Sequence, residues 1–465
     1  MKLTTKQLLL LAGIIAFVAL LFVNLENKDD QMLLRASSLG GLMVFFWFFD
    51  VLPMYVTAML PLALGIPLDL LTPADIAGAY AHKFIFLFLG GFMLALAMEK
   101  WNVHKQLAQT IIRLVGSSKS RILLGFMLST GILSMWISNT ATTIMMLPMV
   151  LAVIKNLDDQ ENSRFPRFLL LSIAYSASIG GMATLVGSPP NSILAGLLDQ
   201  NYGIDISFFD WMKYGMPLSF LLLTLLYFYF IIQIRGEKGS NEIHIGIEKK
   251  PWTSDQIRII VLFIVVAVLW STRGLVLSYL KEYDLAFTYG DEHIAILGAI
   301  VMFAMPSSKG TPILVWEDTP KLPWGILLLF GGGLAMAKML EINGVITEIA
   351  DLFENFKDIN VGILLLIIVT IAIFGTEFMS NTALVSVFVP IIATFAVKSG
   401  FSVTELCIPL ALSASCAFML PIGTPPNAIV FSGSDLKIRQ MAQTGFILNV
   451  MAVLIVVVYA MLFIK

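Results

Sequence analysis

Blocks of about 20 consecutive apolar residues recur along almost the whole chain, from residue 7 to residue 464. An α-helix of that length crosses the hydrocarbon core of a bilayer, which is about 30 Å thick. The residues are apolar at consecutive rather than alternate positions, which argues against a transmembrane β-barrel. Of the 465 residues, 58% are hydrophobic and 13% are charged. The sequence therefore predicts an all-α polytopic protein of the cell membrane, embedded in the lipid bilayer, and excludes a soluble enzyme and a disordered chain.

The polar and ionisable residues exclude further classes of protein. A net charge of −2 provides no electrostatic footprint for nucleic acid. Cys407 and Cys416 lie in an apolar stretch and are predicted to be small packing residues, so we expect no disulfide framework and no zinc-like metal cluster. Lys2 and Lys6 precede the first apolar run as they would in a signal peptide, but residues 24–27 are a poor cleavage site. We therefore predict that this run is a retained transmembrane helix.

Eleven blocks have the character of transmembrane spans. They are predicted at 7–25, 33–50, 52–66, 84–99, 168–198, 214–234, 257–280, 293–306, 323–340, 406–432 and 442–464. Two further apolar segments, 122–154 and 361–397, are each interrupted near the middle by Ser-Asn-Thr. We expect each of these two segments to enter the membrane and return to the same side, as a re-entrant hairpin.

The distribution of charge supports the two hairpins. With the N-terminus in the cytoplasm, most of the 29 lysines and arginines fall in inner loops, and the outer loops are acidic. This is the positive-inside pattern. It holds along the whole chain only if both interrupted segments are hairpins. We therefore predict eleven transmembrane helices plus two re-entrant hairpins, with the C-terminus outside.

The two halves of the chain carry the same three motifs in the same order. The first half has Gly90-Gly91, then Ser138-Asn139-Thr140, then Gly187-Ser188-Pro189-Pro190-Asn191. The second half has Gly331-Gly332, then Ser380-Asn381-Thr382, then Gly423-Thr424-Pro425-Pro426-Asn427. Because the ends of the first hairpin are predicted inside and those of the second outside, the repeats are inverted. Inverted repeats with broken helices are typical of secondary transporters, and the breaks mark the substrate site.

The motifs predict how an ion and an anion are held. Ser-Asn-Thr would cap the returning arm of each hairpin, and the two prolines would unwind the later helix. Four helix N-termini then become available, each with a positive partial charge of roughly half an electron, so an anion site needs no basic side chain. The freed carbonyls and the hydroxyls of Ser134 and Thr376, one turn before each Ser-Asn-Thr, suit sodium. A single such break would indicate only packing, but two copies of two motifs in register favour function.

With these paired motifs the chain resembles the divalent anion:sodium symporters, the INDY-type dicarboxylate transporters, over essentially its whole length. The resemblance implies a homodimer, a scaffold domain, a transport domain that moves as an elevator, and cotransport of sodium with a C4-dicarboxylate such as succinate, fumarate or malate. The implied scaffold comprises residues 1–121, with spans one to four and an interfacial helix near 101–115, and residues 257–360, with spans seven to nine. The implied transport domain comprises residues 122–235 and 361–465, and residues 236–256 form a cytoplasmic linker.

Site residues follow from the motif positions in this resemblance. The substrate carboxylates would contact Asn139, Thr140, Ser188, Asn381, Thr382 and Thr424, with Pro425 packing alongside. Two sodium sites are implied: one with Ser134, Ser138, Asn139 and the carbonyl of Gly187, the other with Thr376, Asn381 and the carbonyls of Met379 and Gly423.

Some alternatives stay open. The same fold would serve a sodium-independent dicarboxylate exchanger or a carrier of tricarboxylate or sulfate, although the hydroxyls of Ser134 and Thr376 favour sodium coupling. Glu377, whose counterpart in the first repeat is Met135, has either an ion-binding role or, as we favour, a hydrogen-bonded structural role. An intramembrane enzyme is disfavoured, because the motifs contain no His, no Cys and no pair of carboxylates.

Overall fold

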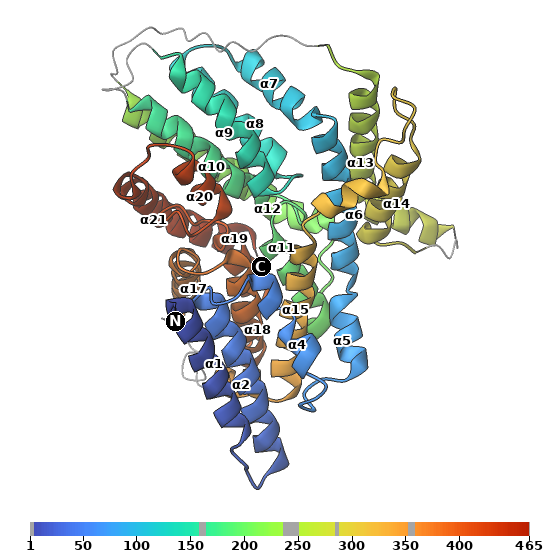
Figure 1. Ribbon diagram of the computed structural model, residues 1–465, viewed down its shortest axis with the longest axis vertical. Coiled ribbons are helices and arrows are strands. Elements are labelled where there is room, and N and C mark those ends of the chain that lie inside the picture. Colours follow the sequence, from blue (N-terminus) through green and yellow to red (C-terminus); the bar gives the residue numbers. More distant parts are fainter. Residues whose placement is uncertain (1–3, 158–163, 236–250, 284–287, 352–358, 465) are drawn as a thin grey trace.

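The computed structural model describes residues 4–157, 164–235, 251–283, 288–351 and 359–464. In these ranges the regular elements are α-helices, apart from the 3-10 helix η1 (Trp316–Lys321) and an isolated bridge between Pro306 and Pro312 (Figure 1). Seven helices in the described part are long and apolar enough to cross a membrane. The all-α class and the membrane location predicted from sequence are therefore confirmed, and several other predicted spans are broken into shorter helices.

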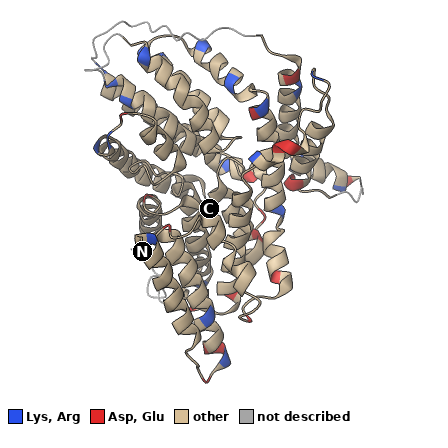
Figure 2. Cartoon of the chain, viewed as in Figure 1, with Lys and Arg blue, Asp and Glu red and all other residues tan. Residues whose placement is uncertain are grey.

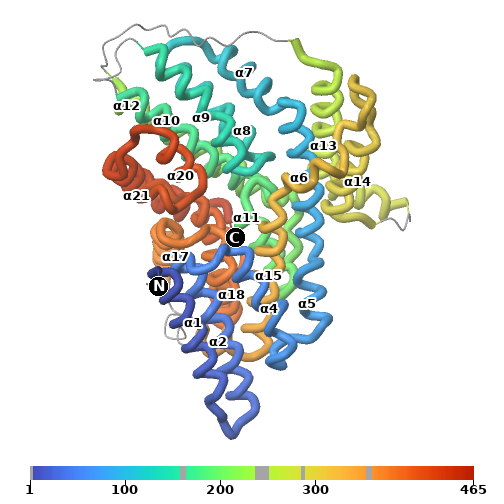
Figure 3. The backbone as a smooth tube through the Cα atoms, in the orientation of Figure 1, coloured from blue at the N-terminus to red at the C-terminus, as the bar shows by residue number. Residues whose placement is uncertain are grey.

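The helices outside the two broken-helix units contact one another and also contact those units. They are α1 (Thr5–Leu21), α2 (Lys28–Phe48), α3 (Met54–Thr57), α4 (Leu60–Leu64), α5 (Pro73–Tyr80), α6 (Lys83–Lys100), α7 (Val103–Val115), α13 (Ser254–Glu282), α14 (Asp291–Ala304), α15 (Trp324–Ile342) and α16 (Val345–Asp351). Helix α15 contacts α2 to α5, and α6 contacts α13 and α14. Helices α1 and α2 extend as a hairpin from the end of the bundle opposite α7 (Figure 3).

Each broken-helix unit contains a helical hairpin, a helix interrupted at the Pro-Pro motif, and a long final helix. The first consists of α8 (Lys119–Ser134), α9 (Asn139–Lys155), α10 (Phe165–Gly181), α11 (Pro189–Tyr202) and α12 (Phe208–Ile234). The second consists of α17 (Val361–Gly375), α18 (Asn381–Ser399), α19 (Val403–Ser413), α20 (Pro425–Ser432) and α21 (Ile438–Phe463). Both hairpins therefore turn just before the Asn of Ser-Asn-Thr, and both later helices are broken just before the Pro-Pro pair, so the motifs supply the N-caps and first residues of α9, α18, α11 and α20.

The two units interlock. Helix α9 of the first packs against α20 of the second, and α11 of the first packs against α18 of the second. The start of each hairpin's returning arm is thereby brought towards the Pro-Pro break of the other repeat. This crossing is what gathers four helix N-termini from distant parts of the chain into one region.

Two boundaries differ from the sequence predictions. The predicted linker 236–256 falls mostly on residues 236–250, which lie outside the described residues, and its end is helical because α13 begins at Ser254. Thr253 and Gln256 form a capping box there, with Thr253 Oγ1 accepting from the Gln256 amide at 3.3 Å. The predicted third span, 52–66, is two short helices, α3 and α4.

The paired glycines lie where helices approach one another closely. A methyl group on Gly90 would lie 2.5 Å from the backbone of Ala295 in α14, and one on Gly332 would lie 2.2 Å from the carbonyl oxygen of Ala58. Only glycine permits such contact between helix backbones. The repeated Gly-Gly motif is thus explained by packing around α6 and α15.

Charged side chains occupy mainly the ends and connections of the helices, and lysines and arginines cluster at the end of the bundle that carries α7 (Figure 2). Helix α7 is strongly amphipathic, with Val103, Ala108 and Ile112 buried and Leu114 exposed.

Candidate functional site

The tip of the first hairpin is a short turn between Ser134 and Asn139. Ser138 is the N-cap of α9, and its Oγ accepts a hydrogen bond from the Ala141 amide at 3.3 Å. The cap predicted for this residue is confirmed. Asn139, the first residue of α9, turns its side chain back across the turn towards Ser134.

The Asn139 amide joins three segments of the chain. In the amide orientation that satisfies its neighbours, the nitrogen lies 2.6 Å from Ser134 Oγ, 3.0 Å from the carbonyl oxygen of Ala177 and 3.3 Å from that of Gly187, and its two hydrogens are shared among these three acceptors. The first contact is within the hairpin and the other two reach both sides of the break between α10 and α11. Ser134, Asn139 and Gly187, which the sequence assigned to one site, are therefore held together.

The first helix break, residues 182–188, is fastened from two directions. Asn191 Nδ2 donates to the carbonyls of Gly181 at 3.1 Å and Thr184 at 2.7 Å. Thr184 Oγ1 accepts from the Gly187 amide at 3.1 Å and donates to the Met135 carbonyl at 2.5 Å. These bonds satisfy backbone groups that the broken helix would otherwise leave unpaired.

Glycine is required at two positions of this break. A methyl group on Gly181 would lie 2.2 Å from the Asn139 side-chain amide, and one on Gly187 would lie 2.5 Å from the Gly181 carbonyl. The same point beside Gly187 is 3.0 Å from the carbonyl oxygens of Ser134 and Met135. Backbone oxygens from the hairpin tip and the break thus converge where side chains are excluded.

The second repeat has the same plan. Thr376 Oγ1 lies 2.5 Å from Asn381 Oδ1 and 3.1 Å from the Ala414 carbonyl oxygen, and these two acceptors share its one hydroxyl hydrogen. Asn427 Nδ2 donates to the carbonyls of Ala417 and Leu420, each at 3.0 Å. By motif register these are the counterparts of the bonds that Asn191 makes in the first repeat.

The remaining predicted residues differ in burial and partners. Ser188 and Thr424 are buried N-caps with extended backbones; Thr424 Oγ1 accepts from the Asn427 amide at 3.3 Å, whereas Ser188 makes no side-chain cap bond. Thr382 is buried, Pro425 is exposed, and Thr140 is half-buried. Ser380 caps α18 by position but without a side-chain bond. In the described part of the chain, the Asn381 side chain is hydrogen-bonded to Thr376. No hydrogen bond joins it there to Met379 or Gly423, the other residues predicted for the second sodium site.

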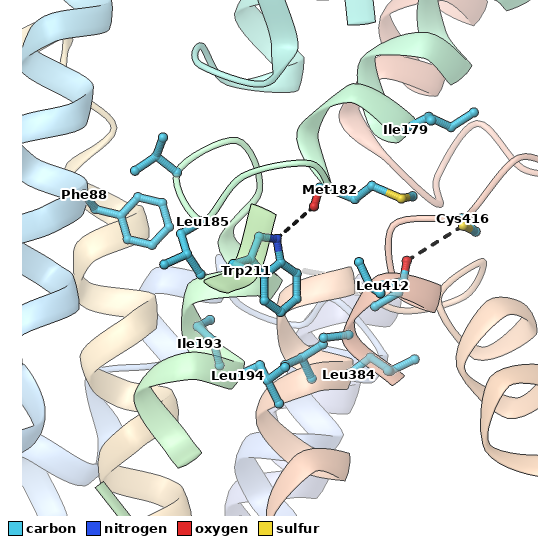
Figure 4. Close-up of a cluster of buried hydrophobic side chains, with 14 of the residues drawn as sticks. Phe88, Ile179, Met182, Leu185, Ile193, Leu194, Trp211, Leu384, Leu412 and Cys416 are labelled. Carbon is cyan, nitrogen blue, oxygen red and sulfur yellow. Dashed lines mark hydrogen bonds between the residues drawn. The ribbon is translucent and has the colours of Figure 1, made fainter. Parts of the chain in front are cut away.

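Buried side chains from both repeats pack between the two breaks. Tyr175 of α10 donates its hydroxyl to the Phe418 carbonyl in the second break at 2.7 Å. Trp211 of α12 donates its indole N–H to the Met182 carbonyl in the first break at 2.9 Å. Figure 4 shows Trp211 among apolar residues of the first repeat, such as Ile193, and of the second, such as Leu384. The breaks are thus held by tertiary contacts rather than by the helices that they interrupt.

Several residues at the tips carry bonds that sequence reasoning did not assign. Asn191 and Asn427 both end the Pro-Pro motif, so the repeat itself was a signal that could have found them. Thr184 and Asn449 have no counterpart of the same residue type in the other repeat, so comparing the two repeats could not identify them. The role of Glu377 was left open between ion binding and structure.

The positive charge of the site comes from the backbone. Helices α9, α11, α18 and α20 all begin at the tips and breaks, and none of the motifs contains Lys, Arg or His. The described residues hold no group of three His, Cys, Asp or Glu side chains that suits a transition metal. Hydroxyl, amide and carbonyl oxygens are hard ligands suited to a cation such as sodium, and helix N-termini attract anions.

Paired units of broken helices that interlock around such a region are typical of secondary transporters. Comparison with known proteins agrees: the model of the sodium:sulfate symporter transmembrane region matches residues 4–465, and the chain belongs to this family. Among its relatives is the sodium-dependent dicarboxylate transporter SdcS of Staphylococcus aureus, 38% identical over 430 residues, which are 88% of this chain and 82% of SdcS. The family and this relative are transporters, not enzymes.

Two solved structures share the fold. The YdaH transporter of Alcanivorax borkumensis has a TM-score of 0.60 and 14% identity, covering 84% of this chain and 87% of its own. MtrF of Neisseria gonorrhoeae has a TM-score of 0.52 and 12% identity, covering 83% of this chain and 82% of its own. At these identities the likeness concerns the fold alone.

Proposed function

We propose that this protein imports C4-dicarboxylates such as succinate, fumarate and malate together with sodium. The observation that carries the proposal is the 38% identity to a sodium-dependent dicarboxylate transporter along 88% of the chain. The paired tips supply a physical reason, because they present oxygen ligands for a cation beside helix N-termini that favour an anion.

The substrate is bound between the two tips. One carboxylate meets Asn139, Thr140 and Ser188, and the other meets Asn381, Thr382 and Thr424, with Pro425 alongside. Ser188 suits this role because its buried hydroxyl makes no cap bond in α11. Burying a dianion without a basic side chain needs compensation, which bound sodium supplies as the largest local charge.

Two sodium ions are cotransported. The first is held by Ser134, Ser138, Asn139 and the Gly187 carbonyl, and the second by Thr376, Asn381 and the carbonyls of Met379 and Gly423. Because Asn139 and Asn381 would each serve both ligands, sodium and substrate strengthen one another's binding by the same factor.

The movement that carries substrate across the membrane is of the elevator type. Residues 122–235 and 361–465 form the transport domain, residues 1–121 and 257–360 form the scaffold, and the protein is a homodimer. The full arrangement comprises eleven transmembrane helices and two re-entrant hairpins in inverted repeats, with the N-terminus cytoplasmic and the C-terminus outside. The contacts of α15 with α2 to α5, and of α6 with α13 and α14, support the scaffold as a unit.

An ion-pair cluster joins the two proposed domains and offers a test of the movement. Lys83 of α6 lies 2.9 Å from Asp199 of α11 and from Asp205. Arg273 of α13 lies 3.6 Å from Asp205 and 3.4 Å from Asp291. Linking residues 83 and 205 in the variant Lys83→Cys/Asp205→Cys with a short, cleavable bis-maleimide should stop uptake, and cleavage should restore it. Unchanged uptake by the linked protein would contradict movement between these domains.

The function itself is tested with purified protein in liposomes. Uptake of labelled succinate should require an inward sodium gradient, and direct binding of succinate should tighten steeply as sodium rises. Equal succinate binding with and without sodium would favour the exchanger. Stronger competition by citrate or sulfate than by fumarate would reassign the substrate to a tricarboxylate or to sulfate.

A further inference from the structure

Glu377 is a buried acid at the tip of the second hairpin, with 1% of its surface exposed. Its Oε1 accepts from the Met419 amide and from Asn449 Nδ2, each at 2.8 Å. Its Oε2 accepts from the Leu420 amide at 2.9 Å. Three donors directed at two oxygens match a carboxylate, which accepts hydrogen bonds and donates none. Glu377 therefore joins the hairpin tip to the helix break and to α21.

The same carboxylate lies against the glycine of the second Pro-Pro motif. A methyl group on Gly423 would be 3.0 Å from Glu377 Oε2 and 3.4 Å from the Leu420 carbonyl. Glu377 thus bonds to the second break at residues 419 and 420, and its Oε2 occupies the space where a side chain on residue 423 would lie. Its neighbour in sequence, Thr376, is hydrogen-bonded to Asn381.

The first repeat fastens its break with different residues. Its counterpart of Glu377 is Met135, whose side chain bears no acceptor of this kind; there Thr184 Oγ1 bonds the Met135 carbonyl and the Gly187 amide. Thr184 corresponds to Leu420, which has no hydroxyl. A third difference lies on the final helices. Gly215 of α12 and Gly445 of α21 each lie against a backbone carbonyl of the break in their own repeat. One helical turn later, α12 has Ser219, which donates to the Ile179 carbonyl, and α21 has Asn449.

We propose that Glu377 is a positioning residue for the second sodium site: by fixing the 417–423 turn against the hairpin tip, it places the Gly423 carbonyl beside Thr376 and Asn381. Thr184 performs the corresponding task in the first repeat. This inference rests on the proposed sodium-coupled function and adds that the two sodium sites are fastened by unlike groups.

A consequence concerns ion selectivity. Hydroxyl and carbonyl ligands distinguish sodium from the smaller lithium ion by the spacing at which they are held, so a loosened turn changes the preference between these ions. The substrate contacts proposed for Asn381, Thr382 and Thr424 do not include Glu377. Loss of Glu377 should therefore weaken ion binding first and substrate binding only through it.

The test measures succinate binding to the full-length purified protein over a range of sodium and of lithium concentrations. Glu377→Met should raise the half-saturating sodium concentration by about tenfold or more, where tenfold is equivalent to about 1.4 kcal/mol. It should also shift the ratio of the sodium and lithium values. At saturating sodium, the succinate Kd should return to within about twofold of the unaltered protein, because linkage removes the defect.

Rescue separates positioning from general damage. The triple variant E377M/L420T/N449S installs the residue types of the first repeat and should restore most of the sodium affinity that E377M loses. If E377M does not fold, E377Q serves, because it keeps the shape but directs an amide nitrogen towards a backbone donor. Glu405→Gln, an acid in the first turn of α19, is the matched control and should leave the sodium value within about twofold, well short of a tenfold effect.

The outcomes are distinguishable. If E377M or E377Q has the same half-saturating sodium concentration as the unaltered protein, this inference is wrong, and the proposed function is unaffected. A raised succinate Kd at saturating sodium with an unchanged sodium value would also overturn it, since Glu377 would then serve the substrate. Sodium-independent binding by the unaltered protein would instead refute the proposed function, and this inference with it.

Discussion

In the first repeat, hydroxyl groups tie the broken helix to the hairpin tip, through Thr184 and the Met135 carbonyl. In the second repeat a carboxylate does so, through Glu377 and the amides of Met419 and Leu420. Asn191 and Asn427 nevertheless bridge equivalent carbonyls in the two breaks. The two repeats therefore share the path of the backbone, because backbone carbonyls and helix N-termini form the site. Apart from this pair of asparagines, the side chains that hold the path differ between the repeats.

The largest effect is expected from a substitution at Gly181, whose counterpart in the second repeat is Ala417. A methyl group on Gly181 would lie 2.2 Å from the Asn139 side chain, whereas the second repeat already accommodates a methyl group at this position. Displacing Asn139 by about 1 Å should reduce succinate uptake by on the order of 100-fold, by analogy with misplaced catalytic groups. We therefore expect Gly181→Ala to be nearly inactive.

Ala417→Gly is the matched exchange and should retain most of the uptake. The measurement is initial uptake into liposomes, normalised to the amount of folded protein. An equal loss of uptake in Gly181→Ala and Ala417→Gly would mean that the two breaks are packed alike at this position, which would contradict the difference between the repeats.

The next-largest effect is expected from the asparagine that ends the Pro-Pro motif in both repeats. Asn191→Ala and Asn427→Ala each remove an amide that bonds two buried carbonyls. Leaving such groups unpaired costs about 1–3 kcal/mol, so each variant should lose a similar part of its stability. Thermal unfolding in detergent, with and without succinate and sodium, measures the loss. A large loss in one variant and none in the other would show that the breaks are not equivalent even in their backbone.

The smallest effect concerns the two hydroxyls one turn before the Ser-Asn-Thr motifs. Thr376 Oγ1 contacts both Asn381 and the Ala414 carbonyl, whereas Ser134 Oγ contacts Asn139. Ser134→Ala and Thr376→Ala each lose hydrogen bonds with net values of about 0.5–1.5 kcal/mol. Each should raise the half-saturating sodium concentration about 2- to 12-fold, with the larger change in Thr376→Ala.

Titration of succinate uptake with sodium distinguishes the two variants. Thr376→Ser is the control for Thr376→Ala, because it keeps the hydroxyl and should stay close to the unaltered protein. If neither alanine variant changes the sodium dependence, the assignment of Ser134 and Thr376 to ion sites is wrong.

Much of the local structure was predictable from short stretches of sequence. The helix starts beside the Ser-Asn-Thr and Pro-Pro motifs were predictable to within a few residues, because capping residues and proline pairs act locally. The linker end was predicted too far along the chain, since the capping box of Thr253 and Gln256 begins α13 within it. At Ser380 the helix starts as predicted, but no side-chain bond caps it.

The sequence alone determined the membrane class, the duplication and the places where helices break, because apolar length, proline geometry and capping act locally and recur visibly in both halves. Only the tertiary structure decided which groups hold those breaks. Glu377 is bonded to residues 419, 420 and 449, and Tyr175 to Phe418, and these partners are remote in sequence and unlike their counterparts in the other repeat. A buried polar group takes whatever partner the fold brings within reach, and that choice depends on how α9, α11, α18 and α20 cross, which no local pattern specifies.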